Sequence, residues 1–326
     1  MGCRAATAAS PRTILRSPGP RSGCRSLAAL ALSALLLVAV TLPAGAQEIV
    51  RRVGRVTFRV DASQAFPGGV VVVRLGSRGR LGAAWALLDG RRAPFYADRG
   101  VPRALVPVAA TAEPGPGTLG VEIAARGGEQ RIAIPLTIAP HEYRPKGVLL
   151  PEAKRALLDR DDAARDGRRL LALLRAESPK PAPGPLLPPV DATGGGFGER
   201  RSYSGVADVE SRTDALQGER HRGLDYAVPT GTAVQAPAAG SVLLAEPLVL
   251  SGGTVVIDHG HGIVSVLLHL SRIDVRAGQG VSAGSPLGLS GETGLAPAPL
   301  LQWRVYLHGI AVDPLLLDTA LRSLSD

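Results

Sequence analysis

The sequence predicts a mostly β protein, with an N-terminal β-sandwich, a linker helix and a C-terminal antiparallel β-domain that carries an open groove. Three observations lead to this prediction. The 326 residues are enough for two domains. The 40 Gly and 27 Pro favour short strands joined by turns, and short apolar runs alternate with such turns along most of the chain. Only residues 151–175 combine leucines and charges in the pattern of a helix.

Residues 1–46 are predicted to be a secretory signal peptide. Five arginines and no acidic residue precede an apolar run from Leu27 to Leu42, and Ala44-Gly45-Ala46 matches the small-residue pattern of cleavage sites. The run has 16 residues, fewer than the ~20 that comfortably span a bilayer, and an uncleaved membrane anchor is the alternative. We therefore expect an exported protein that begins near Gln47 and has no membrane span.

Composition narrows the classes of partner and cofactor. Both cysteines, Cys3 and Cys24, fall within the predicted signal peptide, so the mature chain is expected to lack disulfides and cysteine-bound metals. Its 32 basic against 28 acidic residues, with 3% aromatics, give no reason to expect nucleic-acid binding. A disulfide-free exported chain fits the periplasm of a Gram-negative bacterium, with secretion as the alternative.

Residues 48–140 are predicted to form a β-sandwich of immunoglobulin-like size. About seven short strands over ~95 residues, separated by turn clusters such as Pro67-Gly68-Gly69, are typical of that architecture. These residues contain no recognisable catalytic constellation, so we expect a spacer or docking module.

Residues 151–196 are predicted to be a helix followed by a Pro/Gly-rich linker. Acidic residues crowd the first half of the helical stretch and arginines crowd its second half, an order that the helix dipole favours. We expect these charges to form a solvated face, with docking of a partner as the alternative. The prolines from residue 179 onward and Gly194-Gly195-Gly196 then favour an extended linker that ends in a hinge.

The residues that could carry chemistry lie in the C-terminal part of the chain. His221 and Asp225 flank a glycine at a separation of four residues, and an imidazole and a carboxylate so placed can bind one zinc ion. The segment Leu267-Leu268-His269-Leu270 follows, and then Thr293-Gly294 and Trp303. Each motif alone is a weak signal, but their combination and order are specific.

This ordered series, which spans residues 197–317, resembles the LytM/lysostaphin-type zinc metalloendopeptidases. Members of that family cut the peptide cross-links of bacterial peptidoglycan. The resemblance implies that His221 and Asp225 are the first two zinc ligands and that His269 is a catalytic histidine. It also implies that a second catalytic histidine and the third ligand come from an H-x-H pair just before Trp303.

The sequence departs from the family at this H-x-H pair. Leu300 stands at the position of the second catalytic histidine, and Gln302 stands at that of the last ligand. Leucine can neither bind zinc nor transfer a proton, and an amide oxygen is a far weaker zinc ligand than imidazole. In a strand, Leu300, Gln302 and Arg304 share one face, which would look into the metal site. We expect weak or absent zinc binding, with Gln302 as a weak third ligand and His269 as a residual catalytic group.

Two predictions of function remain. The first is a cell-envelope protein with a degenerate LytM-like domain that binds peptidoglycan or regulates a cell-wall hydrolase such as an amidase. The resemblance supports this class, because degenerate members of the family act as activators of amidases. The second is an active zinc endopeptidase with the altered ligands His221, Asp225 and Gln302, or with His261 as a substitute ligand. The loss of one ligand and one catalytic histidine favours the first prediction.

Overall fold

The computed structural model describes residues 48–54, 56–76, 83–98, 100–125, 128–176, 178, 184–203 and 220–324. All of them belong to the second of two units into which the chain divides, Leu42–Asp326. The predicted signal peptide lies outside the described residues. Within the described ranges, no helix is both long enough and apolar enough to cross a membrane.

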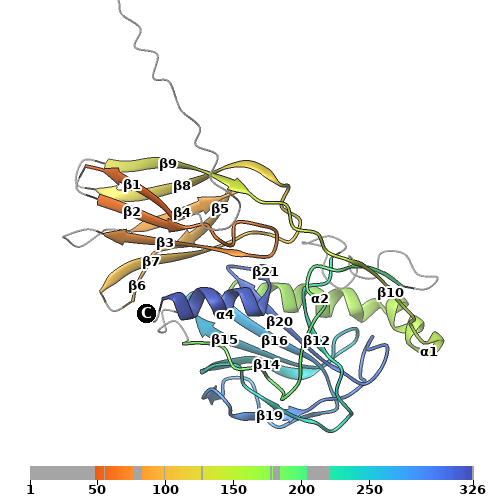
Figure 1. Ribbon diagram of the computed structural model, residues 1–326. Coiled ribbons are helices and arrows are strands. Elements are labelled where there is room, and N and C mark those ends of the chain that lie inside the picture. Colours follow the sequence, from red (N-terminus) through yellow and green to blue (C-terminus); the bar gives the residue numbers. More distant parts are fainter. Residues whose placement is uncertain are drawn as a thin grey trace, which may run out of the picture. The chain divides into compact units, whose positions relative to one another are not determined.

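The N-terminal strands form two antiparallel sheets that share one core (Figure 1). In β2 (Val56–Asp61), Phe58 and Val60 are fully buried and Arg59 between them is exposed, because successive side chains of a strand point to opposite faces. The first sheet has the order β1 (Glu48–Val53), β2, β3 (Val70–Gly76), β7 (Val101–Pro107) and β6 (Tyr96–Asp98). The second has the order β5 (Arg91–Pro94), β4 (Ala84–Leu88), β8 (Gly115–Ala125) and β9 (Gly128–Ile138).

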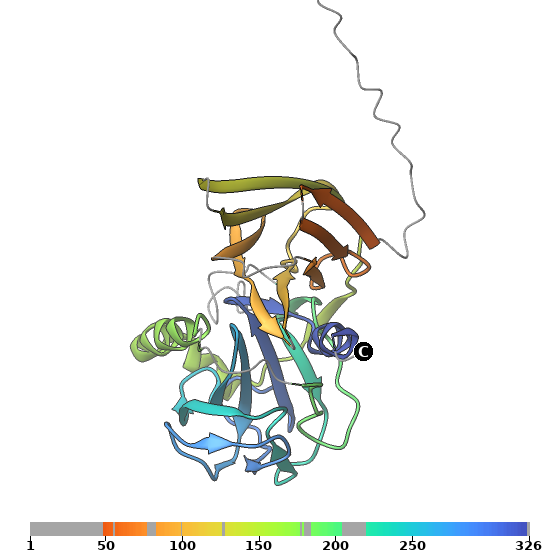
Figure 2. The ribbon, with the colours of Figure 1, turned by 90° about the vertical axis from the view of Figure 1, so that its left-hand side faces the viewer.

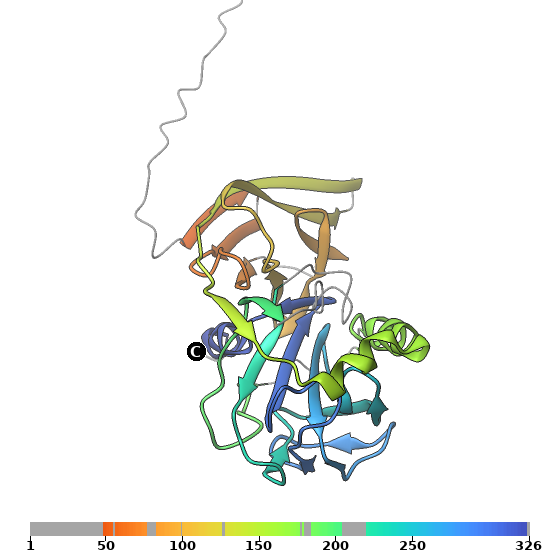
Figure 3. The ribbon, with the colours of Figure 1, turned by 90° about the vertical axis from the view of Figure 1, so that its right-hand side faces the viewer.

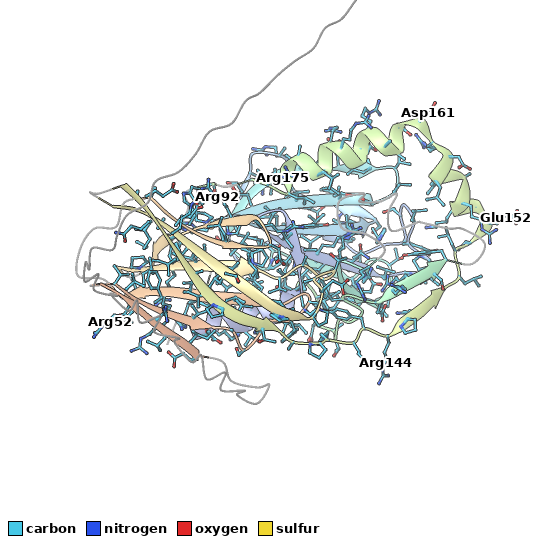
Figure 4. The ribbon with its side chains drawn as sticks, turned by 90° about the horizontal axis from the view of Figure 1, so that it is seen from above. Arg52, Arg92, Arg144, Glu152, Asp161 and Arg175 are labelled. Carbon is cyan, nitrogen blue, oxygen red and sulfur yellow. The ribbon has the colours of Figure 1, made fainter. Side chains whose placement is uncertain are left out.

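The helical stretch expected at residues 151–175 is present, but it is interrupted. It consists of α1 (Glu152–Arg155), the 3₁₀ turn η1 (Ala156–Asp159) and α2 (Asp161–Leu173), and Arg160 between the last two has an extended backbone with ψ 129°. Asp161 begins α2, where a carboxylate stabilises the positive end of the helix dipole; within one continuous helix it would be a poor helix former. Figure 4 labels Glu152 and Asp161 near the beginnings of α1 and α2.

The C-terminal part is built on a seven-stranded antiparallel sheet. Its central strands β15 (Gly252–Gly260), β16 (Ile263–Leu270) and β20 (Leu301–Leu307) are buried along their whole lengths, although β15 and β20 also contain polar residues such as Asp258 and Arg304. Figures 2 and 3 show α2 and α4 (Pro314–Ser323) on opposite sides of this sheet. The strand order is β12 (Gly223–Tyr226), β20 (Leu301–Leu307), β16 (Ile263–Leu270), β15 (Gly252–Gly260), β14 (Gly240–Leu248) and β18 (Gly280–Val281), with β21 (Ile310–Val312) paired to β20.

A small three-stranded sheet completes this part of the chain. It has the order β13 (Ala233–Gln235), β19 (Pro286–Leu289) and β17 (Arg272–Ile273). The mostly β architecture with antiparallel sheets that the sequence predicts is thereby confirmed.

A short strand attaches the segment before the helices, residues 145–150, to the C-terminal part. β10 (Pro145–Val148) pairs in parallel with β11 (Arg200–Tyr203). The next side chains point alternately inward and outward. Val148 and Leu150 are buried, whereas Leu149 is 77% exposed. Leu150 packs in a separate apolar cluster that includes Leu250 and Leu295. Residues 145–150 therefore contribute to the folded structure beside the predicted site.

Truncation of the buried Leu150 side chain is expected to destabilise the fold. Leu150→Ala should lower the free energy of unfolding by about 2–4 kcal/mol, because it removes a buried side chain and leaves a cavity beside Leu250. Equilibrium urea denaturation measures the change. The neighbouring Leu149→Ala is the matched control and should change the free energy of unfolding by less than about 0.5 kcal/mol. Equal effects of the two substitutions would contradict the packing described here.

Candidate functional site

Three neighbouring strands bring the predicted site residues together. The register of β12 with β20 places Asp225 opposite Gln302, and the register of β16 with β20 places Leu268 opposite the same residue. His269 follows Leu268 at the end of β16, and His221 lies just before β12. Three segments that are far apart in the sequence therefore meet around one position of β20.

His221, Asp225 and Gln302 form a triangle of polar atoms. Nε2 of His221 lies 3.2 Å from Oδ1 of Asp225. Nε2 of Gln302 lies 2.9 Å from the same carboxylate oxygen and 3.5 Å from His221 Nε2. Ligands bound at zinc distances around a tetrahedral ion are about 3.3–3.6 Å from one another. The three atoms therefore keep roughly the spacing of a zinc ligand set.

The chemistry at the third corner of this triangle does not suit a metal. Arg304 Nε donates a hydrogen bond of 2.6 Å to Oε1 of Gln302. A guanidinium has no acceptor, so the amide oxygen must face Arg304 and the NH2 group must face Asp225. The corner thus presents hydrogens where zinc needs a lone pair. The expected role of Gln302 as a weak third ligand does not agree with this orientation.

The residues present do not fit zinc. Only His221 and Asp225 offer suitable ligand atoms at the triangle, and two protein ligands are fewer than known zinc sites use. Over the described part of the chain, no group of three or more His, Cys, Asp or Glu side chains is arranged to hold a metal ion.

A buried arginine balances the charge of Asp225. Arg201, on β11, places Nη2 2.8 Å from Oδ2 of Asp225 and 3.0 Å from Oε2 of Glu199, and its side chain is 5% exposed. Burial by itself raises the pKa of the Asp225 carboxyl. The charges and hydrogen bonds of His221, Arg201 and Gln302 outweigh burial and hold this pKa well below its usual range. Asp225 is therefore ionised at neutral pH.

His269 is neutral at neutral pH. Its Nδ1 lies 2.8 Å from the carbonyl oxygen of Thr293, which can only accept, so Nδ1 carries the proton and Nε2 keeps its lone pair. Burial lowers the pKa of His269 to about 4, although the hydrogen bond to Thr293 and the charge of Asp225 oppose this shift. The imidazole can therefore accept a hydrogen bond through Nε2, but it has no second proton to donate.

The groove predicted from the sequence is a small cavity of about 40 Å³, space for a few water molecules. Arg201 and Arg304 contribute its cationic groups, and Leu300 contributes an apolar wall together with Val148 of β10. His221 was expected to line the groove, but it is fully buried and lies behind the wall.

Two other histidines of this part of the chain, His259 and His261, serve the fold. The ring of His261 stacks on Tyr96 with 4.1 Å between the centroids, so it is not placed as a substitute ligand. His259 is buried, with Nδ1 2.9 Å from the carbonyl oxygen of Ala239 and Nε2 2.9 Å from Oγ of Ser265. This agrees with the structural role that its glycine-rich hairpin suggests.

The sequence-based reasoning missed Arg201 and the contact of Arg304 with Gln302. Arg200 and Arg201 are adjacent, and only the alternation of β11 shows which of them points inward. The strand pattern placed Arg304 on the face of Gln302 but could not reveal a hydrogen bond between their side chains. Arg201 is therefore assigned to the site by the structure alone, as is the contact of Arg304 with Gln302.

Comparisons with known proteins place the C-terminal part in a family. The family model described as Peptidase family M23 matches residues 219–314. An uncharacterized metalloprotease of Haemophilus influenzae is 41% identical over 96 residues, which are 29% of this chain and 20% of that protein. The peptidoglycan DD-endopeptidase ShyA of Vibrio cholerae is 40% identical over 93 residues, which are 28% of this chain and 22% of that protein. The chain spans about a fifth of the length of these curated relatives.

A solved structure extends the similarity to most of the chain. The crystal structure of a protein from Pseudomonas aeruginosa described as a peptidase M23 is 30% identical to this chain, with a TM-score of 0.56. The match covers 78% of this chain and 96% of that one, so it includes far more than the C-terminal part. The family resemblance predicted from the sequence is confirmed. This chain belongs to peptidase family M23.

Proposed function

We propose that this protein is an exported, periplasmic member of the family that does not hydrolyse peptidoglycan. In this proposal it binds peptidoglycan, or regulates a cell-wall hydrolase such as an amidase, through its M23 domain. The observation that carries the proposal is the orientation of Gln302, whose NH2 group faces Asp225 where the family places a metal ligand. A protein that lacks this ligand is not expected to retain zinc.

Leu300 also supports a non-hydrolytic function, because its side chain cannot transfer a proton. It lies in the cavity wall where the family resemblance implies a catalytic histidine, and its side chain has no titratable group. A positioned general acid or base contributes about 10²–10⁴ to the rate of such reactions. His269 alone can accept a proton through Nε2 but has none to donate at neutral pH. Together these features favour binding over hydrolysis.

Peptidoglycan as the polymer is supported by the relatives. Matching proteins are named as peptidoglycan DD-endopeptidases in Vibrio cholerae and as DD-carboxypeptidase/endopeptidase in Neisseria meningitidis. The cavity offers a hydrogen-bond acceptor on His269, guanidinium donors on Arg201 and Arg304, and an apolar wall at Leu300. These groups suit a small part of a peptide, such as one carbonyl group next to a methyl group.

A second candidate is an active zinc endopeptidase with an altered ligand set. It is favoured by one observation, the 3.2 Å separation of His221 Nε2 and Asp225 Oδ1, which is the spacing of two ligands on one ion. This candidate requires the amide of Gln302 to turn over, or another ligand to complete the set.

Metal content and muropeptide release distinguish the two candidates. The purified exported form, expressed with its signal and recovered from the periplasm, is expected to contain substoichiometric zinc and to release no soluble muropeptides from sacculi. The peptidoglycan DD-endopeptidase ShyA serves as the positive control for release. Stoichiometric zinc together with released muropeptides would support the endopeptidase and reject the proposal.

Sacculus binding and amidase stimulation test the rest of the proposal. Co-sedimentation with sacculi is expected if the protein binds peptidoglycan. Faster release of peptides by a periplasmic amidase, when this protein is added, is expected if it regulates that hydrolase. The absence of both effects would reject the proposed function even for a metal-free protein.

A further inference from the structure

The contact between Gln302 and Arg304 bears on why this site would exclude a metal ion. We propose that Gln302 and Arg304 form a clasp that keeps zinc out, with the NH2 group of Gln302 in the place of a third metal ligand and Arg304 as the positioning residue that holds it there. The inference rests on the proposed non-hydrolytic function and explains how the retained residues His221 and Asp225 remain without a metal.

The amide nitrogen of Gln302 contacts both retained ligand residues. It lies 2.9 Å from Asp225 Oδ1 and 3.5 Å from His221 Nε2, so it contacts both of the retained ligand atoms. The hydrogen bond to the ionised carboxylate is charge-assisted, which makes it stronger than a hydrogen bond between neutral groups. The amide therefore occupies the corner of the triangle and also satisfies the carboxylate that a metal would otherwise bind.

The amide of Gln302 cannot rotate by 180° without losing its hydrogen bonds. A rotation of 180° would bring its NH2 group against Nε of Arg304, now 2.6 Å from Oε1, so that two donors would face each other. The same rotation would bring the amide oxygen against the carboxylate of Asp225. Gln302 is 5% exposed and Arg304 is 7% exposed, so little water is available to replace the lost hydrogen bonds. Arg304 thus fixes the orientation that excludes zinc.

The neighbouring strand β12 leaves room for the side chain of Arg304. Gly223 on β12 lies opposite Arg304 on β20. A Cβ at Gly223 would lie 2.8 Å from Cγ of Arg304 and 2.5 Å from the carbonyl oxygen of Trp303. Because Gly223 has no side chain, the aliphatic part of the Arg304 side chain can lie against β12 while the guanidinium group reaches Gln302.

A double-mutant cycle separates the orientation of the amide from the charge of the arginine. Arg304→Met is made in the natural chain and in the Gln302→His variant, where no amide remains to be oriented. Zinc affinity is measured with Zn²⁺ alone, by competition with a chromophoric chelator, and Co²⁺ absorption reports the coordination geometry. The effect of the charge is present in both backgrounds, whereas the effect of the clasp is present only with Gln302.

The cycle has a defined expected result. Arg304→Met should raise the zinc affinity of the natural chain roughly ten- to hundredfold more than it raises that of Gln302→His, the range that a hydrogen bond to a charged group represents. Arg304→Lys keeps a donor and a charge, so it should leave the affinity close to that of the natural chain. Equal effects of Arg304→Met in the two backgrounds would overturn the clasp, as would tight zinc binding by the natural chain.

Gln302→Glu keeps the test decisive if Arg304→Met does not fold. This nearly isosteric variant can accept the hydrogen bond of Arg304 with one oxygen and present the other to the triangle. It should bind zinc more tightly than the natural chain although Arg304 is unchanged, and no gain would overturn the clasp. Muropeptide release by the natural chain is measured separately, so a failed clasp without hydrolysis leaves the proposed function in place.

Discussion

Substitution of both Leu300 and Gln302 by histidine is expected to produce a protein that binds zinc stoichiometrically. Position 302 lies opposite Asp225 in the sheet, so an imidazole there completes the triangle with His221. It also removes the amide whose orientation Arg304 controls. The affinity for zinc should rise at least about a hundredfold, because even groups that only support a metal ligand contribute 10–100-fold. Metal analysis after dialysis and isothermal titration with Zn²⁺ measure the gain.

The histidine at position 300 is expected to affect the rate of hydrolysis rather than the affinity for zinc. The double variant should release muropeptides from sacculi about 10²–10⁴ times faster than Gln302→His, the contribution of one general acid or base. Leu300→His alone is the matched control and should bind no more zinc than the natural chain. Unchanged metal content in the double variant would contradict the assignment of Leu300 and Gln302 to the H-x-H pair of the family.

Much of this site could be predicted because its signals are local in the sequence. The motif around His221 and Asp225 and the segment around His269 each keep the family pattern within a few residues. Thr293-Gly294 and Trp303 bracket the altered pair, and their spacing led to the prediction that position 302 lies at the site. In the structure, Gln302 lies opposite Asp225.

The features that could not be predicted depend on contacts between distant segments. Arg201 and Asp225 meet only because β11 and β12 approach each other in the fold, and nothing near Arg201 in the sequence marks it as buried. The direction of the Gln302 amide depends on a side-chain contact with Arg304, which strand periodicity does not specify. The break at Arg160 likewise places Asp161 and Asp162 in the first turn of α2, which the apolar pattern of the helix does not reveal.

Replacement of Arg201 by methionine is expected to lower the free energy of unfolding by about 3–5 kcal/mol at neutral pH, the usual cost of breaking a buried ion pair. Methionine preserves much of the side-chain volume but leaves Asp225 ionised and without its guanidinium partner. Adding Asp225→Asn removes the uncompensated charge and should recover a large part of the loss. Arg200→Met, at the exposed neighbouring position, is the matched control and should change the free energy of unfolding by less than about 0.5 kcal/mol.

The loss caused by Arg201→Met is also expected to depend on pH. The pKa of Asp225 in the folded protein lies below its value in the unfolded chain, so the folded state favours the ionised carboxylate. The resulting stabilisation is fully present above the unfolded pKa of about 4 and is lost as the pH falls below it. Urea denaturation at pH 7 and in acid should therefore show a smaller difference between the natural chain and Arg201→Met in acid. A difference that stays constant or grows on acidification would contradict the ion pair between Arg201 and Asp225 as its cause.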